Sequence, residues 1–143
     1  MTSYAFDILV DRVTVLCCSC ALARSGLTAY GVTHLDMMTQ MKVLDNFCMV
    51  YATYYYYPYI DFEHFVTPET TNPLILKPTK ERAIVEYILN EKWCDEGILI
   101  EALKTYLQWF RNDEELYCVA DFFGLDRKTL DYWIKEALED AEV

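Results

Sequence analysis

Residues 113–138 constrain the fold most, because every local signal in this stretch indicates a pair of helices. Asp113 is expected to cap the first helix, and acidic residues fill its first turn, where the helix dipole favours negative charge. Gly124 stands where a left-handed residue would end that helix, and Asp126 can cap the second one. Both segments have apolar residues at helical spacing, namely Leu116, Val119, Ala120, Phe123, Leu130, Trp133, Ile134, Ala137 and Leu138. The sequence therefore predicts two short helices joined by a tight turn, the outline of a helix-turn-helix.

Two more helices are predicted before this pair. Thr79 and Asp95 are suited to cap them, and apolar residues repeat at helical spacing after each cap. The C-terminal half should then be a bundle of about four helices. Near the N-terminus, the small residues after Cys18 favour a helix over 19–25, ended by Gly26, whereas the stretch up to Cys18 fits a helix or a buried strand.

Between these helices the composition favours strands. Aromatic and β-branched residues predict strands at 47–51, 53–57 and 60–66, with Pro58 at a bend and a last strand at 74–76; residues 34–42 fit either a helix or a strand. The expected fold class is α+β, a small antiparallel β-sheet (about 43–76) flanked by an N-terminal helix and the C-terminal bundle. We expect a single domain, 1–143, with a helix-plus-sheet half (1–78) and an acidic helical half (79–143).

Charge is concentrated in the helical half. The whole chain carries −11, and residues 79–143, with 16 acids and 8 bases, account for −8 of it. Such a field repels nucleic acid and anionic membranes and favours basic protein partners. The predicted partner-binding carboxylates are Asp113, Glu114, Glu115, Asp121 and Asp131.

A run of tyrosines is the second candidate surface. Tyrosine combines a large apolar area with a polar tip and is common at protein interfaces. The run comprises Tyr54, Tyr55, Tyr56 and Tyr57, with Tyr59 just after it. In a strand these side chains alternate between faces, so half of them could contact a partner, or a second copy in a homodimer, unless all pack beneath the helices.

A DNA-binding surface is the alternative use of the helix pair. Its second helix corresponds to the recognition helix of DNA-binding proteins, where basic side chains can contact phosphates. The residues in question are Arg127, Lys128, Tyr132 and Lys135. Acidic residues surround these bases, so nucleic-acid binding is disfavoured.

The sequence predicts no catalytic, cofactor-binding or metal-binding site. The cysteines at 17, 18 and 20 lack a second ligand pair at matching spacing. Asp61, Glu63 and His64 would point to two faces of a strand, and so would not converge as a hydrolytic site. The absence of a secretory signal or a spanning apolar run, with six cysteines, predicts a cytoplasmic protein with free thiols.

Three segments resemble the AbiEi-type abortive-infection antitoxin family without its N-terminal winged helix. Residues 20–27, Cys-Ala-Leu-Ala-Arg-Ser-Gly-Leu, resemble the family's small-residue helix that ends in Gly-Leu. Residues 76–83, Leu-Lys-Pro-Thr-Lys-Glu-Arg-Ala, are similar to its strand and following helix start, and 116–138 to its closing helix pair.

The resemblance implies a non-enzymatic protein that neutralises a toxin or represses transcription in bacterial defence. Repression in this family uses the winged helix, which puts DNA binding further in doubt here. An alternative is a phage or mobile-element inhibitor, an anti-CRISPR or anti-restriction protein that covers the basic nucleic-acid channel of a host nuclease. The expected partner is therefore a toxin or a nuclease, and no cofactor is expected.

Overall fold

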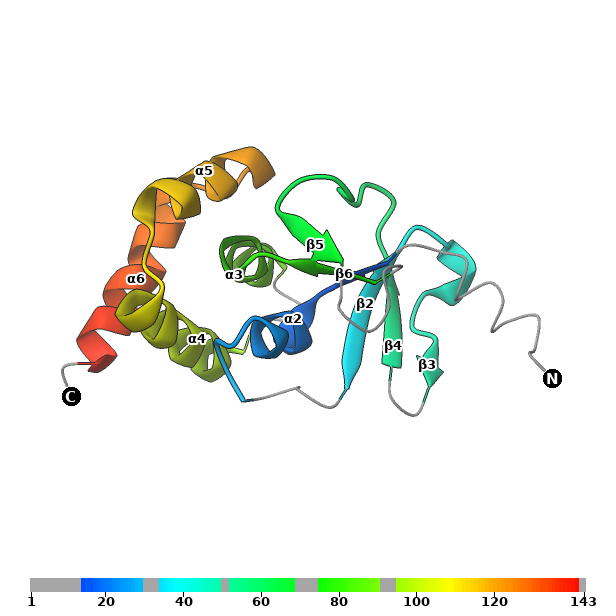
Figure 1. Cartoon of the computed structure of the whole chain (residues 1–143), viewed down its shortest axis with the longest axis horizontal. Coiled ribbons are helices and arrows are strands. Elements are labelled where there is room, and N and C mark those ends of the chain that lie inside the picture. Colours follow the sequence, from blue (N-terminus) through cyan, green and yellow to red (C-terminus); the bar gives the residue numbers. More distant parts are fainter. Residues whose placement is uncertain (1–13, 30–33, 50–51, 69–74, 91–94, 142–143) are drawn as a thin grey trace.

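The computed structural model describes residues 14–29, 34–49, 52–68, 75–90 and 95–141 (Figure 1). Its strands are β1 (Thr14–Leu16), β2 (Leu35–Thr39), β3 (Cys48–Met49), β4 (Ala52–Tyr56), β5 (Val66–Pro68) and β6 (Ile75–Pro78). Its helices are α2 (Cys18–Arg24), the 3-10 helix η1 (Lys42–Leu44), α3 (Lys80–Leu89), α4 (Glu96–Trp109), α5 (Asp113–Phe123) and α6 (Arg127–Ala141). The predicted α+β class is confirmed.

The sheet differs from the predicted one in extent and in direction. Its strand order is β3-β4-β2-β1-β6-β5, so a central strand, β1, comes from residues that precede the predicted sheet. β1 is parallel to β6 and β2 is parallel to β4, whereas the other neighbours are antiparallel. The prediction of an antiparallel sheet over 43–76 is therefore wrong, because a strand of three residues is too short to show an alternating pattern.

Both faces of the sheet are covered. Strand alternation places Leu16 and Met37 in the main core with the helices, whereas Val15 and Met38 face a smaller cluster on the opposite side. Half-buried apolar residues of the segment after β4, including Phe62, pack onto this second cluster. A sheet with two covered faces leaves little room for an exposed row of strand side chains.

The helices extend the main core away from the sheet. α2 and α3 pack together, α3 packs against α5, and α4 packs against α6. Figure 1 shows α4, α5 and α6 at the end of the molecule remote from β3 and β4. One continuous core runs from Leu16 in β1 to Ala137 in α6, so the four C-terminal helices are built onto the sheet half and are not a separate bundle.

The helix ends follow the predicted capping chemistry. The Thr79 hydroxyl accepts the Arg82 N–H at 3.3 Å, and the Asp95 carboxylate accepts the Ile98 N–H at 3.1 Å. Gly124 adopts the left-handed conformation that ends α5, with φ of 80°.

One predicted cap is wrong by one residue. Asn112, not Asp113, caps α5, because its side-chain oxygen accepts the Glu115 N–H at 3.1 Å. Asp113 is the first helical residue, and its carboxylate is held by Arg111 at 2.9 and 3.2 Å. Because the Asp113 carboxylate is engaged by Arg111, the side-chain amide of Asn112 caps the helix in its place.

Candidate partner-binding surface

The tyrosine run does not form the exposed row that partner binding would require. Tyr54 is only 6% exposed and belongs to the main core, which leaves little of its side chain for contact with a partner. Tyr55, Tyr56 and Tyr57 are half-buried, because β4 lies inside a sheet whose two faces are both covered. Tyr59, in the turn that follows, is 95% exposed and is the one member of the run that presents its whole ring to solvent.

The predicted acidic residues do lie at the surface. Asp113, Glu114, Asp121 and Asp131 are exposed and Glu115 is half-buried, and all five belong to α5 and α6. Asp121 pairs with Arg127, and Asp131 accepts the hydroxyl of Tyr117. No ion pair is found for Glu114 or Glu115 among the described residues, so their charges are available to a partner.

Helices α4, α5 and α6 and their connections have far more acid than their own bases can neutralise. Residues 95–141 hold 12 acids and 5 bases. Four of those bases already form ion pairs with acids of the same segment, namely Lys104, Arg111, Arg127 and Lys135. We call the exposed carboxylates of α4, α5 and α6 the acidic helical surface, which comprises Glu96, Asp113, Glu114, Asp121, Asp131, Glu139 and Asp140.

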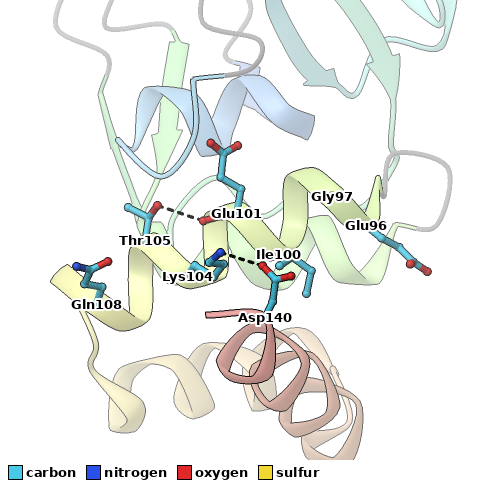
Figure 2. Close-up of a pocket in the computed structure, with 8 residues that line it drawn as sticks. All are labelled: Glu96, Gly97, Ile100, Glu101, Lys104, Thr105, Gln108 and Asp140. Carbon is cyan, nitrogen blue, oxygen red and sulfur yellow. Dashed lines mark hydrogen bonds and ion pairs between the residues drawn. The ribbon is translucent and has the colours of Figure 1, made fainter. Parts of the chain in front are cut away.

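A groove of about 530 Å³ lies on this surface between α4 and α6 (Figure 2). Three carboxylates line it, those of Glu96, Glu101 and Asp140, against one ammonium group, that of Lys104. Lys104 pairs with Asp140 at 2.8 Å, which joins α4 to α6, and the Thr28 hydroxyl donates to Glu101 at 2.8 Å. The remaining negative charge suits a lysine or arginine side chain of a partner.

Exposed aromatic side chains accompany the acidic helical surface. Trp109 is 70% exposed at the end of α4, next to Gln108, which lines the groove. Phe122 and Tyr132 are 48% and 55% exposed on α5 and α6. Tryptophan and tyrosine are the residue types that most often dominate binding energy at protein interfaces, so these rings add apolar anchors to a charged surface.

The residues of the DNA-binding alternative are largely engaged with acids. Arg127 donates two hydrogen bonds to Asp121, at 3.1 and 2.6 Å, and Lys135 lies 3.9 Å from Glu139. Lys128 is exposed without an ion pair among the described residues. Tyr132, on the same helix, stacks edge-on against Trp133 at 5.2 Å. A DNA phosphate would therefore have to displace carboxylates from two of the three predicted bases.

The segment around Asp61 is a turn and not the predicted strand. The Asp61 Oδ1 atom accepts the N–H groups of Glu63 and His64, at 2.8 and 2.7 Å, and this turn brings the His64 ring within 2.9 Å of Oδ2. The prediction that Asp61 and His64 lie apart is thus wrong, because a side-chain acceptor captured the backbone donors that a strand would have used.

An ion pair that the sequence reading missed lies beneath this turn. Arg82 has no exposed surface; its Nε atom lies 3.1 Å from Glu86, and Nη1 donates to the His64 carbonyl at 2.8 Å. Burial raises the pKa of Glu86, and Arg82 opposes this rise. The sequence did contain a signal for this ion pair, since a base and an acid lie four residues apart in an otherwise apolar helix. The pair holds the turn to α3.

Replacing Asp61 by asparagine should lower the free energy of unfolding by about 1 kcal/mol at neutral pH, because the turn loses charge-assisted hydrogen bonds. Desolvation opposes the charged form, but the bonds from His64 and Glu63 outweigh it and lower the pKa of Asp61. The ionised Asp61 therefore makes its full contribution to the free energy of unfolding above its pKa in the unfolded chain, about 3.9. This contribution is lost as the pH falls through its lower pKa in the folded protein. Urea unfolding from pH 7 to pH 2 measures this difference. Glu63→Gln is the matched control, and an equal effect there would contradict the assignment.

The cysteines carry neither disulfides nor a metal cluster in the part of the chain that the structure describes. Cys17, Cys18, Cys20, Cys48 and Cys118 are free thiols. Burial raises the pKa of Cys17, and that of Cys20 to about 11, so both are protonated at neutral pH. No three His, Cys, Asp or Glu side chains of the described residues come together as metal ligands would.

No protein-family model matches this sequence, and a comparison with curated proteins finds no match either. Within the described ranges, none of the helices has the length and apolar character needed to cross a bilayer. Surface chemistry is thus the main indication of function.

Proposed function

We propose that this chain is a non-enzymatic protein-binding module, similar to an AbiEi-type antitoxin, which acts in the cytoplasm by neutralising a basic protein partner through its acidic helical surface. The observation that carries the proposal is the excess of 12 acids over 5 bases in 95–141, of which four bases are already paired. An uncompensated surface of one sign attracts a partner of the other sign and accelerates the encounter.

The groove between α4 and α6 gives this attraction a specific point of contact. A basic side chain that enters it would meet the carboxylates that line it, while the exposed Trp109, next in sequence to Gln108, would pack against the partner's apolar surface. Central aromatic anchors surrounded by charge are the usual anatomy of a tight interface. The groove is therefore the proposed centre of the binding site.

Two kinds of basic partner fit the same surface. The first is a cognate toxin of a bacterial defence system; the second is a host nuclease, which a phage or mobile-element protein would inhibit by occupying its nucleic-acid channel. The two differ in one measurable property: an inhibitor of the second kind competes with DNA for the nuclease, whereas antitoxin binding to a toxin without a nucleic-acid channel does not.

The test uses the purified chain 1–143, treated with nuclease and mixed with candidate toxins and with CRISPR or restriction nucleases. For any partner found, Glu114→Lys should weaken binding by about tenfold, because it reverses a charge on the acidic helical surface. The dissociation constant is measured by calorimetry at two salt concentrations, and higher salt should weaken the wild-type complex.

Glu63→Lys is the matched control, since it makes the same change in net charge on an exposed residue outside the helical half. It should leave affinity within about twofold. Equal losses in both variants would show that net charge alone matters. Retention of DNA and of no protein would overturn the proposal and favour the alternative centred on Lys128.

A further inference from the structure

A second groove, of about 620 Å³, has the opposite charge to the rest of the molecule. It lies where the end of α2, strands β5 and β6 and the start of α3 meet, with Phe110 from the end of α4 at its border. Its described lining residues include three bases, Arg24, Lys77 and Lys80, and one acid, Glu81. The groove thus carries a net positive charge in a chain of net charge −11.

Arg24, Lys77 and Lys80 have no acidic partner among the described residues. Of the ten lysines and arginines that the structure describes, five make ion pairs with acids and five do not. Three of the five unpaired ones are those of the groove. Gathering like charges costs free energy unless an anion lies between them. Among the described lining residues the one carboxylate is that of Glu81, and it accepts a hydrogen bond from the Tyr106 hydroxyl at 2.7 Å.

Two buried polar atoms in the groove lining also lack partners. Ser25 is 9% exposed, and its hydroxyl has no hydrogen-bond partner among the described residues. The Nε atom of Arg24 is likewise buried without an acceptor. Buried polar groups are almost always satisfied in native proteins, so a group bound in the groove could supply the partners that these two atoms lack among the described residues.

The start of α3 supplies further donors. Thr79 caps this ten-residue helix and satisfies the Arg82 N–H, whereas the first-turn N–H groups of Lys80 and Glu81 have no acceptor within the helix. Helix N-termini favour anions through these donors and through the helix dipole.

We propose that this groove binds the phosphate group of a small phosphorylated ligand. The groove offers three cations, a hydroxyl and a helix N-terminus, which is more positive charge and more donors than one carboxylate can match. A phosphate carries about two negative charges and three strong acceptor oxygens, and so suits such a groove better. Phe110, already beneath the Lys80 ammonium at 4.5 Å, provides an apolar wall for the remainder of the ligand. None of these residues belongs to the acidic helical surface, so the two sites are tested separately.

Calorimetric titration of the full chain with inorganic phosphate, AMP and adenosine, at constant ionic strength, tests the proposal. Phosphate and AMP should bind saturably, and adenosine should not. Lys77→Gln should weaken both by about tenfold, whereas Lys42→Gln, which removes an exposed unpaired lysine outside the groove, should change them less than twofold.

Ser25→Ala separates a ligand contact from a structural role. In phosphate-free buffer it should raise the melting temperature by roughly 2–4 °C, because it removes an unsatisfied buried hydroxyl, yet it should weaken phosphate binding about tenfold. Absence of saturable phosphate binding, equal losses in Lys77→Gln and Lys42→Gln, or adenosine binding equal to that of AMP would each overturn the proposal. Tight duplex DNA binding that phosphate does not compete would assign a nucleic-acid surface in its place.

Discussion

Replacing Arg82 by methionine is expected to lower the free energy of unfolding by about 3–5 kcal/mol, the largest loss we expect from removal of one charge. The guanidinium is fully buried and contacts three parts of the chain: Glu86 on its own helix, the His64 carbonyl in the turn after β4, and the Phe123 ring at 4.9 Å on α5. Without it, Glu86 is left as an uncompensated buried carboxylate.

Urea unfolding at neutral pH measures this loss, with two comparison variants. The double variant Arg82→Met/Glu86→Leu should recover most of it, because the apolar pair removes both charges together. Arg127→Met removes a guanidinium with two hydrogen bonds to Asp121, but both side chains are more than half exposed, so the cost should stay below about 1 kcal/mol. Equal costs for the buried and the exposed arginine would contradict the assigned role.

Replacing Tyr106 by alanine is expected to lower the free energy of unfolding by about 3–5 kcal/mol, because the ring is fully buried in the main core. Its hydroxyl also joins three helices: it lies 2.7 Å from Glu81 of α3 and 3.1 Å from both the N–H and the carbonyl of Asn112, which caps α5. Tyr106→Phe keeps the ring and should cost about 1–3 kcal/mol through these lost bonds alone.

The two Tyr106 variants are compared by urea unfolding and by amide hydrogen exchange. Tyr106→Phe should increase exchange in the first turn of α5, since the capping residue loses its anchor, while exchange in β2 and β4 stays unchanged. Tyr117→Phe, which removes a hydroxyl from an exposed pair with Asp131, is the matched control and should cost less than about 1 kcal/mol. A Tyr106→Phe cost as small as this control's would show that the hydroxyl is not structural.

The helix ends could be predicted because their causes are local. Thr79, Asp95 and Gly124 each act within four residues, so the sequence nearby contains the whole signal. The sheet could not be predicted in this way, because β1 pairs with strands more than twenty and sixty residues later in the chain. The turn at Asp61 also escaped prediction, since an aspartate that accepts two N–H groups forms a turn without a glycine or proline of its own.

For the candidate sites, too, local features could be predicted from the sequence and features formed by distant residues could not. The exposure of the acidic residues of α5 and α6 could be predicted, because charged side chains usually remain in water. The burial of Tyr54 could not be predicted, because strand alternation does not indicate whether a sheet is covered on one face or on both. The basic groove was missed because Arg24, Lys77 and Phe110 are distant in sequence and only the fold brings them together.

The place of β1 in the sheet affects how each new chain is assembled on the ribosome. β1 can join β2 soon after it emerges, but its other neighbour, β6, is synthesised roughly sixty residues later. At roughly 5–20 residues per second, the open edge of β1 waits about 3–12 seconds for its parallel partner. During that interval the backbone groups of this edge are unpaired, so the nascent sheet is most exposed to aggregation or chaperone capture just before β6 emerges.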